Sequence, residues 1–154
     1  MKLPKGQRAI IERLAGPPTR RIVVPADATP QPGRWVLEIP GWRPATLWEL
    51  TKRGNHWSAA RHKKKDRELV AAYALKAGIP PATTKRRVTM LQVRAGRQMP
   101  IDDDNAWKSV LDALVQCRLL VDDRPEWLER APLEQEKGPR KLTRIILEDL
   151  ANAK

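Results

Sequence analysis

The sequence predicts an α/β fold of the α+β type, with two main helices packed on a small mixed β-sheet of about four strands. Strand-like and helix-like segments follow one another in the order β-α-β-α-β-β. Strands separated by helices and then followed by a strand pair imply such a mixed sheet. The chain has 154 residues, of which 41% are hydrophobic, and this is enough for one modest core.

The strand predictions follow from runs of apolar and β-branched residues, and they cover residues 35–39, 87–93, 127–135 and 142–147. The last two are expected to form a hairpin that turns at Lys137-Gly138-Pro139. A first helix is predicted from Ser58, as its N-cap, to about Lys76. A second is predicted to begin at Asp104 or Asn105 and to end near Arg118.

Residues 1–34 are predicted to be an N-terminal extension of a core domain that covers residues 35–154. This extension contains six prolines, with a short helix predicted over residues 7–14 and an extended arm after it. Residues 40–57 are predicted to form a loop that carries tryptophan and basic side chains.

The composition excludes several classes of protein. No apolar run is long enough to span a membrane, and the N-terminus lacks a secretory apolar segment, so we expect a soluble, cytoplasmic protein. The single Cys117 excludes an internal disulfide and a thiolate zinc site, and a small buried thiol is the expected role. Calcium-loop and phosphate-binding glycine-loop motifs are not found in the sequence.

The formal net charge is +12, which favours a polyanion such as DNA or RNA as the partner. Residues 102–123 nevertheless hold six of the eighteen acidic residues and two of the thirty Lys and Arg residues. An acidic cluster repels phosphate unless it binds a cation. The charge distribution therefore favours a protein that brings a divalent cation to a nucleic-acid phosphate.

Asp102 and Asp104 stand two residues apart after the second predicted strand. In an extended segment such residues face the same side, so both carboxylates are expected to reach one point while Asp103 points elsewhere. Carboxylate oxygens suit Mg²⁺, with Mn²⁺ as a substitute. Asp-Asp-Asp-Asn before a helix is also an ordinary cap, and this alternative stays open.

The second predicted helix places Lys108 one turn beyond Asp104, on the same face, where it can point toward a bound phosphate. Asp122-Asp123 follow this helix, and a third carboxylate there would complete a metal site. Taken alone, Asp122-Asp123 is an ordinary turn.

The basic residues outside this region form two groups, which are the predicted phosphate contacts. The expected DNA-binding residues are Lys52, Arg53, Lys63, Lys64, Arg86, Arg87, Arg94 and Arg97. A solvated helix face is the alternative for part of residues 61–67. Stacking on unpaired bases and simple packing are both open for Trp42, Trp48 and Trp57.

The acidic pattern is similar to that of a known family. The run Asp102-x-Asp104-Asn105-x-x-Lys108, then Asp112-Ala113-Leu114, then Leu120-x-Asp122-Asp123, resembles the RusA family of Holliday junction resolvases of bacteria and their phages. The likeness is clearest over residues 102–123 and extends more loosely over 36–149. One departure is Met99-Pro100-Ile101, where family members often carry basic residues.

The resemblance implies a homodimer that binds branched DNA and cuts four-way junctions by paired symmetric nicks in the presence of Mg²⁺. It implies that Asp102, Asp104 and Asp123 are the catalytic, metal-binding carboxylates and that Lys108 is the essential lysine. It also implies a role in DNA recombination and repair and a location in the cytoplasm of a bacterial or phage-infected cell. The alternatives are a non-enzymatic basic DNA-binding protein and a metal nuclease that acts on other branched DNA.

Overall fold

The computed structural model describes residues 33–46 and 56–150, and the fold is reported for these residues. The helix predicted over residues 7–14 and the arm that follows it lie outside the described residues up to residue 32, whereas Arg34, the last residue of the predicted extension, belongs to the first strand. Trp48, Lys52 and Arg53 also lie outside the described residues.

The predicted α+β fold is confirmed, with five strands and two helices in the described part of the chain. In chain order the elements are β1 (Arg34–Pro40), α3 (His56–Ala77), β2 (Arg86–Arg94), α4 (Asp103–Gln116), β3 (Leu128–Arg130), β4 (Glu134–Lys137) and β5 (Leu142–Asp149). Each strand and helix predicted beyond residue 34 therefore has a counterpart in the described residues, and the predicted strand over 127–135 corresponds to the two short strands β3 and β4.

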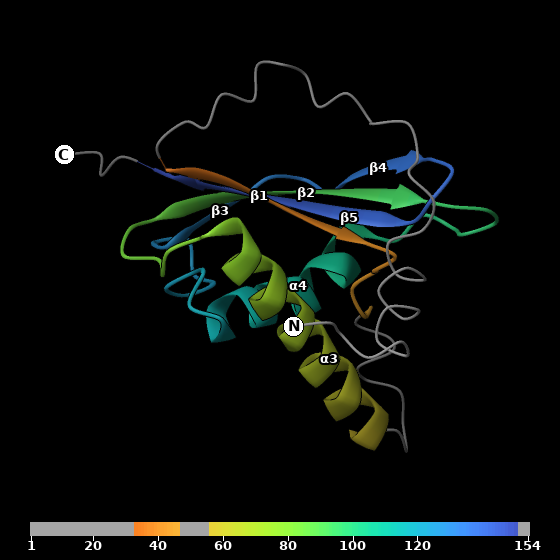
Figure 1. Ribbon diagram of the computed structural model, residues 1–154, viewed down its shortest axis with the longest axis horizontal. Helices are drawn as coiled ribbons and strands as arrows, with labels where there is room; N and C mark the ends of the chain where they lie inside the picture. The colour runs from red at the N-terminus through yellow and green to blue at the C-terminus, as the bar shows by residue number, and fades with distance from the viewer. Residues whose placement is uncertain (1–32, 47–55, 151–154) are drawn as a thin grey trace, which may run out of the picture. The chain divides into compact units, whose positions relative to one another are not determined.

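The sheet is mixed, with the strand order β1-β5-β2-β3, and β4 also pairs with β2 (Figure 1). Strand β5 lies between β1 and β2 and is antiparallel to both. Strands β3 and β4 pair with the other edge of β2 and run parallel to it. Helix α4 is the crossover that parallel neighbours such as β2 and β3 require.

The predicted hairpin between the last two strands is wrong, because β2 lies between β4 and β5. The connection crosses the end of β2, where the Gly138 amide donates to the Arg94 carbonyl at 2.8 Å. A Cβ on Gly138 would lie 2.5 Å from a methyl carbon of Val93, so this close crossing requires glycine. The crossing places the alternating apolar residues of β5 at the centre of the sheet.

The break between β3 and β4 also has a local cause. Pro132 has no amide hydrogen to donate to a ladder. The next amide, that of Leu133, donates to the Asp103 carboxylate at 2.6 Å instead of to a strand. The connection therefore bends toward α4 at this point.

Both helices cover the same face of the sheet, and the core lies between them and that face (Figure 1). The alternating inward residues of three strands meet buried residues of α3 and α4 there. They include Leu37, Ile39, Val88, Met90, Ile145, Leu147, Val70, Trp107, Val110 and Leu114.

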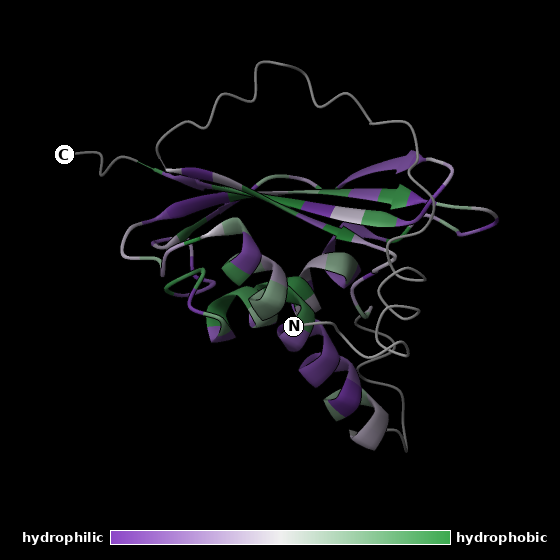
Figure 2. Cartoon of the chain, in the orientation of Figure 1, coloured by the Kyte–Doolittle hydropathy of each residue, from purple (hydrophilic) through white to green (hydrophobic). Residues whose placement is uncertain are grey.

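Helix α3 changes character along its length. Its second half packs on the core through Val70 and Ala74, whereas residues 60–65 are all exposed. Figure 2 shows this first half as a strongly hydrophilic segment that extends away from the sheet. None of the helices in the described residues is long and apolar enough to cross a membrane.

Candidate active site at the start of helix α4

The start of α4 is set by contacts from β4. The Gln135 side chain bonds both backbone groups of Ile101, accepting from its amide at 2.9 Å and donating to its carbonyl at 2.8 Å. Asp102 follows as the N-cap residue with an extended backbone (φ −63°, ψ 142°), and its carbonyl accepts from the Ala106 amide at 3.1 Å. The segment that carries the acidic residues is therefore fixed on the sheet.

The geometry of the three aspartates differs from the predicted alternation. The helix begins at Asp103, so the extended chain needed to place Asp102 and Asp104 on one side ends one residue too early. The residue expected to point elsewhere, Asp103, is the most strongly held of the three. Its carboxylate accepts from the Trp107 indole at 3.2 Å and from the Leu133 amide at 2.6 Å.

A residue outside the predicted site completes this arrangement. Arg130, at the end of β3, places Nη2 3.0 Å from Oδ2 of Asp103 and 3.4 Å from Oδ1 of Asp104. The guanidinium carbon lies 5.5 Å from the centre of the Trp107 ring. Arg130 is 26 residues beyond Asp104, and only the parallel pairing of β2 and β3 brings it to the site, so no short sequence pattern marks it.

Asp102 and Asp104 have much of their carboxylate surface open to solvent. The Asp104 side chain is 92% exposed, and its contact in the described structure is Arg130. Asp102 is also exposed and accepts a long bond of 3.4 Å from the Asn105 side chain. These two carboxylates are therefore the accessible oxygen donors at this end of α4.

Lys108 lies one turn further along α4 and is exposed. Its Nζ is 3.7 Å from Oδ1 of Asp112, which is a weak i,i+4 pair at the surface. Its charged end is therefore directed to Asp112, one turn further from the start of the helix, and its role at a bound phosphate stays a prediction.

Asp122 and Asp123 lie on the connection from α4 to β3, and Asp123 is seven residues beyond the end of α4. Figure 1 shows this connection leaving the end of α4 opposite the start that carries Asp104. Asp122 accepts from the Asp123 amide at 2.7 Å and from Arg124 at 2.8 Å. The hydrogen bond from Arg124 lowers the pKa of the Asp122 carboxyl more than any other contact does. Asp122 is therefore ionised at neutral pH.

The donors at the start of α4 meet only part of the needs of a magnesium ion. Mg²⁺ is usually held by one or two carboxylates together with water and substrate phosphate, and Asp102 and Asp104 are the accessible carboxylates at this end of α4. The Arg130 guanidinium already sits as a cation between two carboxylates there. In residues 33–46 and 56–150, no group of three or more His, Cys, Asp or Glu side chains could hold a metal ion. The residues therefore fit a magnesium ion only in part. Asp102 and Asp104 are accessible at the start of α4, whereas Asp123 lies on the connection after the helix.

The predicted phosphate contacts fall into different environments. Lys63 and Lys64 are exposed on the first half of α3, and Arg97 is exposed on the turn after β2. Arg87 is half-exposed and bonds Glu129 at 2.7 Å. Arg94 is partly buried and donates to the Gln98 carbonyl at 3.1 Å.

Arg86 does not suit its predicted role. The side chain is 1% exposed and bonds Asp149 at 2.7 Å, the Leu119 carbonyl at 2.9 Å and the Pro80 carbonyl at 3.2 Å. It also stacks on the Trp35 ring at 4.7 Å. These contacts commit the guanidinium to the interior, so Arg86 is removed from the proposed DNA-binding set.

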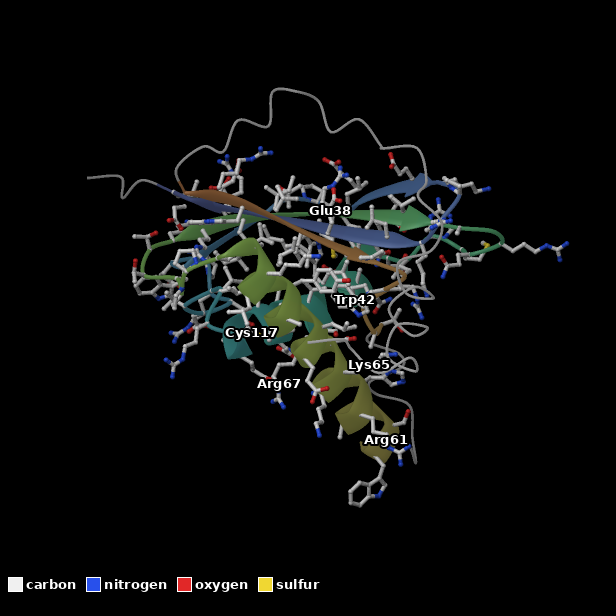
Figure 3. All side chains as sticks on the ribbon, in the orientation of Figure 1. Glu38, Trp42, Arg61, Lys65, Arg67 and Cys117 are labelled. Atoms are coloured by element: carbon white, nitrogen blue, oxygen red, sulfur yellow. The ribbon has the colours of Figure 1, made fainter. Side chains whose placement is uncertain are left out.

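Trp42 and Trp57, the two described tryptophans of the predicted loop, have different surroundings. Trp42 is buried and donates to the Asp66 carboxylate at 2.9 Å, so it packs beneath the sheet, as Figure 3 shows. Trp57, at the start of α3, is 73% exposed. Packing is therefore the role of Trp42, and an exposed indole stands at the far end of the basic half of α3.

Cys117 is half-buried rather than fully buried, and it lies beside Arg67 (Figure 3). Burial raises the pKa of its thiol, and the charge of Arg67 opposes this shift. The thiol is therefore mostly protonated at neutral pH, which agrees with a packing role.

Neither a scan against models of known protein families nor a search of the curated proteins finds a match to this chain. What can be said of function therefore rests on the residues and on their arrangement.

Proposed function

We propose that this protein is a Mg²⁺-dependent, structure-specific endodeoxyribonuclease that resolves four-way DNA junctions by paired symmetric nicks. The observation that supports the proposal is that Asp102 and Asp104 at the start of α4 are both exposed, with the exposed Lys108 one turn further along the same helix. This acidic cluster belongs to a chain with a net charge of +12. The choice of a junction as substrate rests on the resemblance to the RusA family.

In this proposal Asp102 and Asp104 hold the divalent cation. The bound cation would supply Lewis acidity to the scissile phosphate and lower the pKa of the attacking water. Lys108 neutralises charge on the phosphate as the phosphorus–oxygen bond breaks. Water adds to phosphorus and the 3′-oxygen leaves, so the products are a 5′-phosphate and a 3′-hydroxyl. Asp123 enters as a third ligand from the family resemblance alone.

The DNA is proposed to lie along the exposed basic residues. Residues 61–65 of α3 contribute four basic side chains in a segment that extends away from the sheet. Arg97 lies on the turn between β2 and α4, five residues before Asp102. Phosphate contacts of this kind set affinity and orientation, and the branched shape of the substrate supplies selectivity.

A second candidate is a non-enzymatic DNA-binding protein. It is favoured by the finding that the described residues contain no group of three carboxylate, histidine or cysteine side chains able to hold a metal. In that case Asp102 would be only the N-cap residue of α4, whose side chain makes no capping hydrogen bond, and Asp103 would be a structural partner of Arg130.

Cleavage of a synthetic four-way junction with and without Mg²⁺ separates the two candidates. Asp104→Asn should bind the junction as the unaltered protein does and should cut about 100-fold more slowly or not at all. Glu136→Gln makes the same change of charge on the exposed strand β4 and should cut at the unaltered rate. Full cutting by Asp104→Asn, or no Mg²⁺-dependent cutting by the unaltered protein, contradicts the nuclease proposal. Linear duplex and single strands serve as comparison substrates.

A further inference from the structure

The first half of helix α3 is a charged segment that lies before the contacts joining this helix to α4. Asp66, in the middle of α3, accepts from the Ser109 hydroxyl of α4 at 2.6 Å. The next residue, Arg67, donates to the Gln116 side chain at 3.2 Å. Residues 60–65, which precede these contacts, are all exposed, and Figure 2 shows them in a hydrophilic segment that extends away from the sheet. Nearly two turns of helix are therefore available to a partner.

The cations of this segment point to opposite sides of the helix. Four basic residues lie within five consecutive positions, and all four are exposed, namely Arg61, Lys63, Lys64 and Lys65. A helix turns by about 100° per residue, so Lys63 stands about 200° around the axis from Arg61, whereas Lys65 returns to within about 40° of Arg61. A helix that lies on a flat polyanion needs cations on one face alone. The two-sided arrangement fits a partner whose negative charges flank the helix.

The helix does not compensate these charges itself. Residues 56–65 contain no Asp or Glu, although acidic residues near the start of a helix would offset its dipole. Arg61 and Lys65 form a like-charged i,i+4 pair, which destabilises a helix. Lys64 has an opposite charge in Glu68, but the two atoms are 3.9 Å apart and both side chains are exposed. The segment therefore lacks the negative charge that a bound polyanion would supply.

We propose that the first half of α3 enters a groove of a DNA duplex arm and contacts the phosphates of both strands. The major groove is about 12 Å wide and admits a helix of about 10–12 Å in diameter, with a phosphate backbone on each side. Residues 60–65 include one apolar residue, Ala60, so the segment offers no apolar face to a membrane surface. This inference rests on the proposed function for the choice of DNA as the partner, and it does not depend on the metal site.

The test measures binding of the full chain to a linear DNA duplex by fluorescence anisotropy over a range of salt concentrations. Arg61→Gln and Lys63→Gln should each lower the salt slope by about 0.9, and the double change by about twice as much, because each removes a phosphate contact on its own side. Arg61→Lys keeps the charge and should keep the slope. Lys76→Gln, exposed at the other end of α3, is the matched control and should leave the slope unchanged.

Arg61→Glu distinguishes a DNA contact from a structural role. The new carboxylate lies one turn before Lys65, in the favourable orientation of an i,i+4 pair, and it removes a positive charge near the start of the helix. Amide hydrogen exchange of residues 60–65 in the free protein should therefore slow, while DNA binding weakens. Faster exchange together with weaker binding would show that Arg61 acts by holding the helix, and would contradict the inference.

The possible outcomes separate this inference from the proposed function. If only one of Arg61→Gln and Lys63→Gln lowers the slope, α3 contacts DNA on one face and the groove contact is overturned. Unchanged slopes in both variants would show a solvated helix and would also overturn it. The proposed function is tested separately, by Mg²⁺-dependent cutting of the junction by the unaltered protein. If the unaltered protein binds neither duplex nor junction, the inference and the proposed function both fail.

Discussion

Arg86 and Arg87 are adjacent in β2, yet their side chains have opposite surroundings. Arg86 is buried and bonds two backbone carbonyls and Asp149, while Arg87 is half-exposed and bonds Glu129. The alternation of a strand places neighbours on opposite faces of the sheet, so one basic residue enters the interior and the next stays at the surface. The contrast makes the two residues a natural pair for comparison.

Arg86→Ala should lower the free energy of unfolding by about 2–4 kcal/mol, because it leaves two buried carbonyls without a donor. Arg87→Ala should change it by about 1 kcal/mol or less, since the ion pair that it removes is at the surface. Urea unfolding followed by tryptophan fluorescence measures both. Similar losses of stability in the two variants would show that Arg86 is not the interior anchor that its contacts indicate.

At the scale of elements, one buried carboxylate joins three parts of the fold. Asp66 of α3 is 4% exposed and accepts from the Trp42 indole at 2.9 Å, the Ala45 amide at 3.2 Å and the Ser109 hydroxyl at 2.6 Å. These donors belong to the segment after β1 and to α4. Asp66 therefore holds the start of the β1–α3 connection and the two helices together.

Asp66→Ala should lower the free energy of unfolding by about 2–4 kcal/mol, because three buried donors lose their acceptor. Glu68→Ala, two residues along the same helix, removes an exposed pair with Lys64 and should change stability by less than about 1 kcal/mol. Thermal or urea unfolding gives the comparison. A loss of stability for Asp66→Ala no larger than that for Glu68→Ala would contradict the role of Asp66 as the junction of these elements.

The exposed half of α3 leads to a prediction about DNA affinity. Arg61, Lys65 and Arg67 lie along this helix in Figure 3, and Lys63 and Lys64 are exposed beside them. The double change Lys63→Gln with Lys64→Gln should weaken junction binding and reduce the salt slope by about 0.9 for each phosphate that is no longer neutralised. Lys76→Gln, exposed at the other end of α3, should leave the slope unchanged. Binding measured from low to moderate salt tests this, and equal slopes would exclude α3 as a DNA contact.

At the scale of the whole molecule, the proposed paired cleavage requires two sites. Two identical sites related by a two-fold axis suit a symmetric junction. Sedimentation should therefore give twice the mass of one chain. A junction extruded in a circular plasmid should yield linear product without a build-up of nicked circles. A monomer that leaves nicked circles would contradict the expected homodimer.

Much of the local structure could be predicted from the sequence. The apolar periodicity of the chain predicts both helices and the positions of the strands within a few residues, because these patterns depend on neighbours three or four residues away, or two in a strand. The acidic cluster and its lysine could also be located, since both depend on composition and short spacing. The same local patterns place Asp104 or Asn105 at the start of a helix. In the structure this helix begins at Asp103.

The remaining features depend on contacts between distant segments. The crossing of β2 by the β4–β5 connection makes β5 a central strand, and turn chemistry at Gly138 alone does not distinguish this from a hairpin. The parallel pairing of β2 with β3 brings Arg130 to Asp103 and Asp104. Arg86 is enclosed by contacts with the distant residues Leu119 and Asp149. The sequence by itself determined which segments are helices and strands and which residues carry the acidic and basic charge. The tertiary structure decided which of those charges meet, because sheet order is selected by burial over the whole chain rather than by any short pattern.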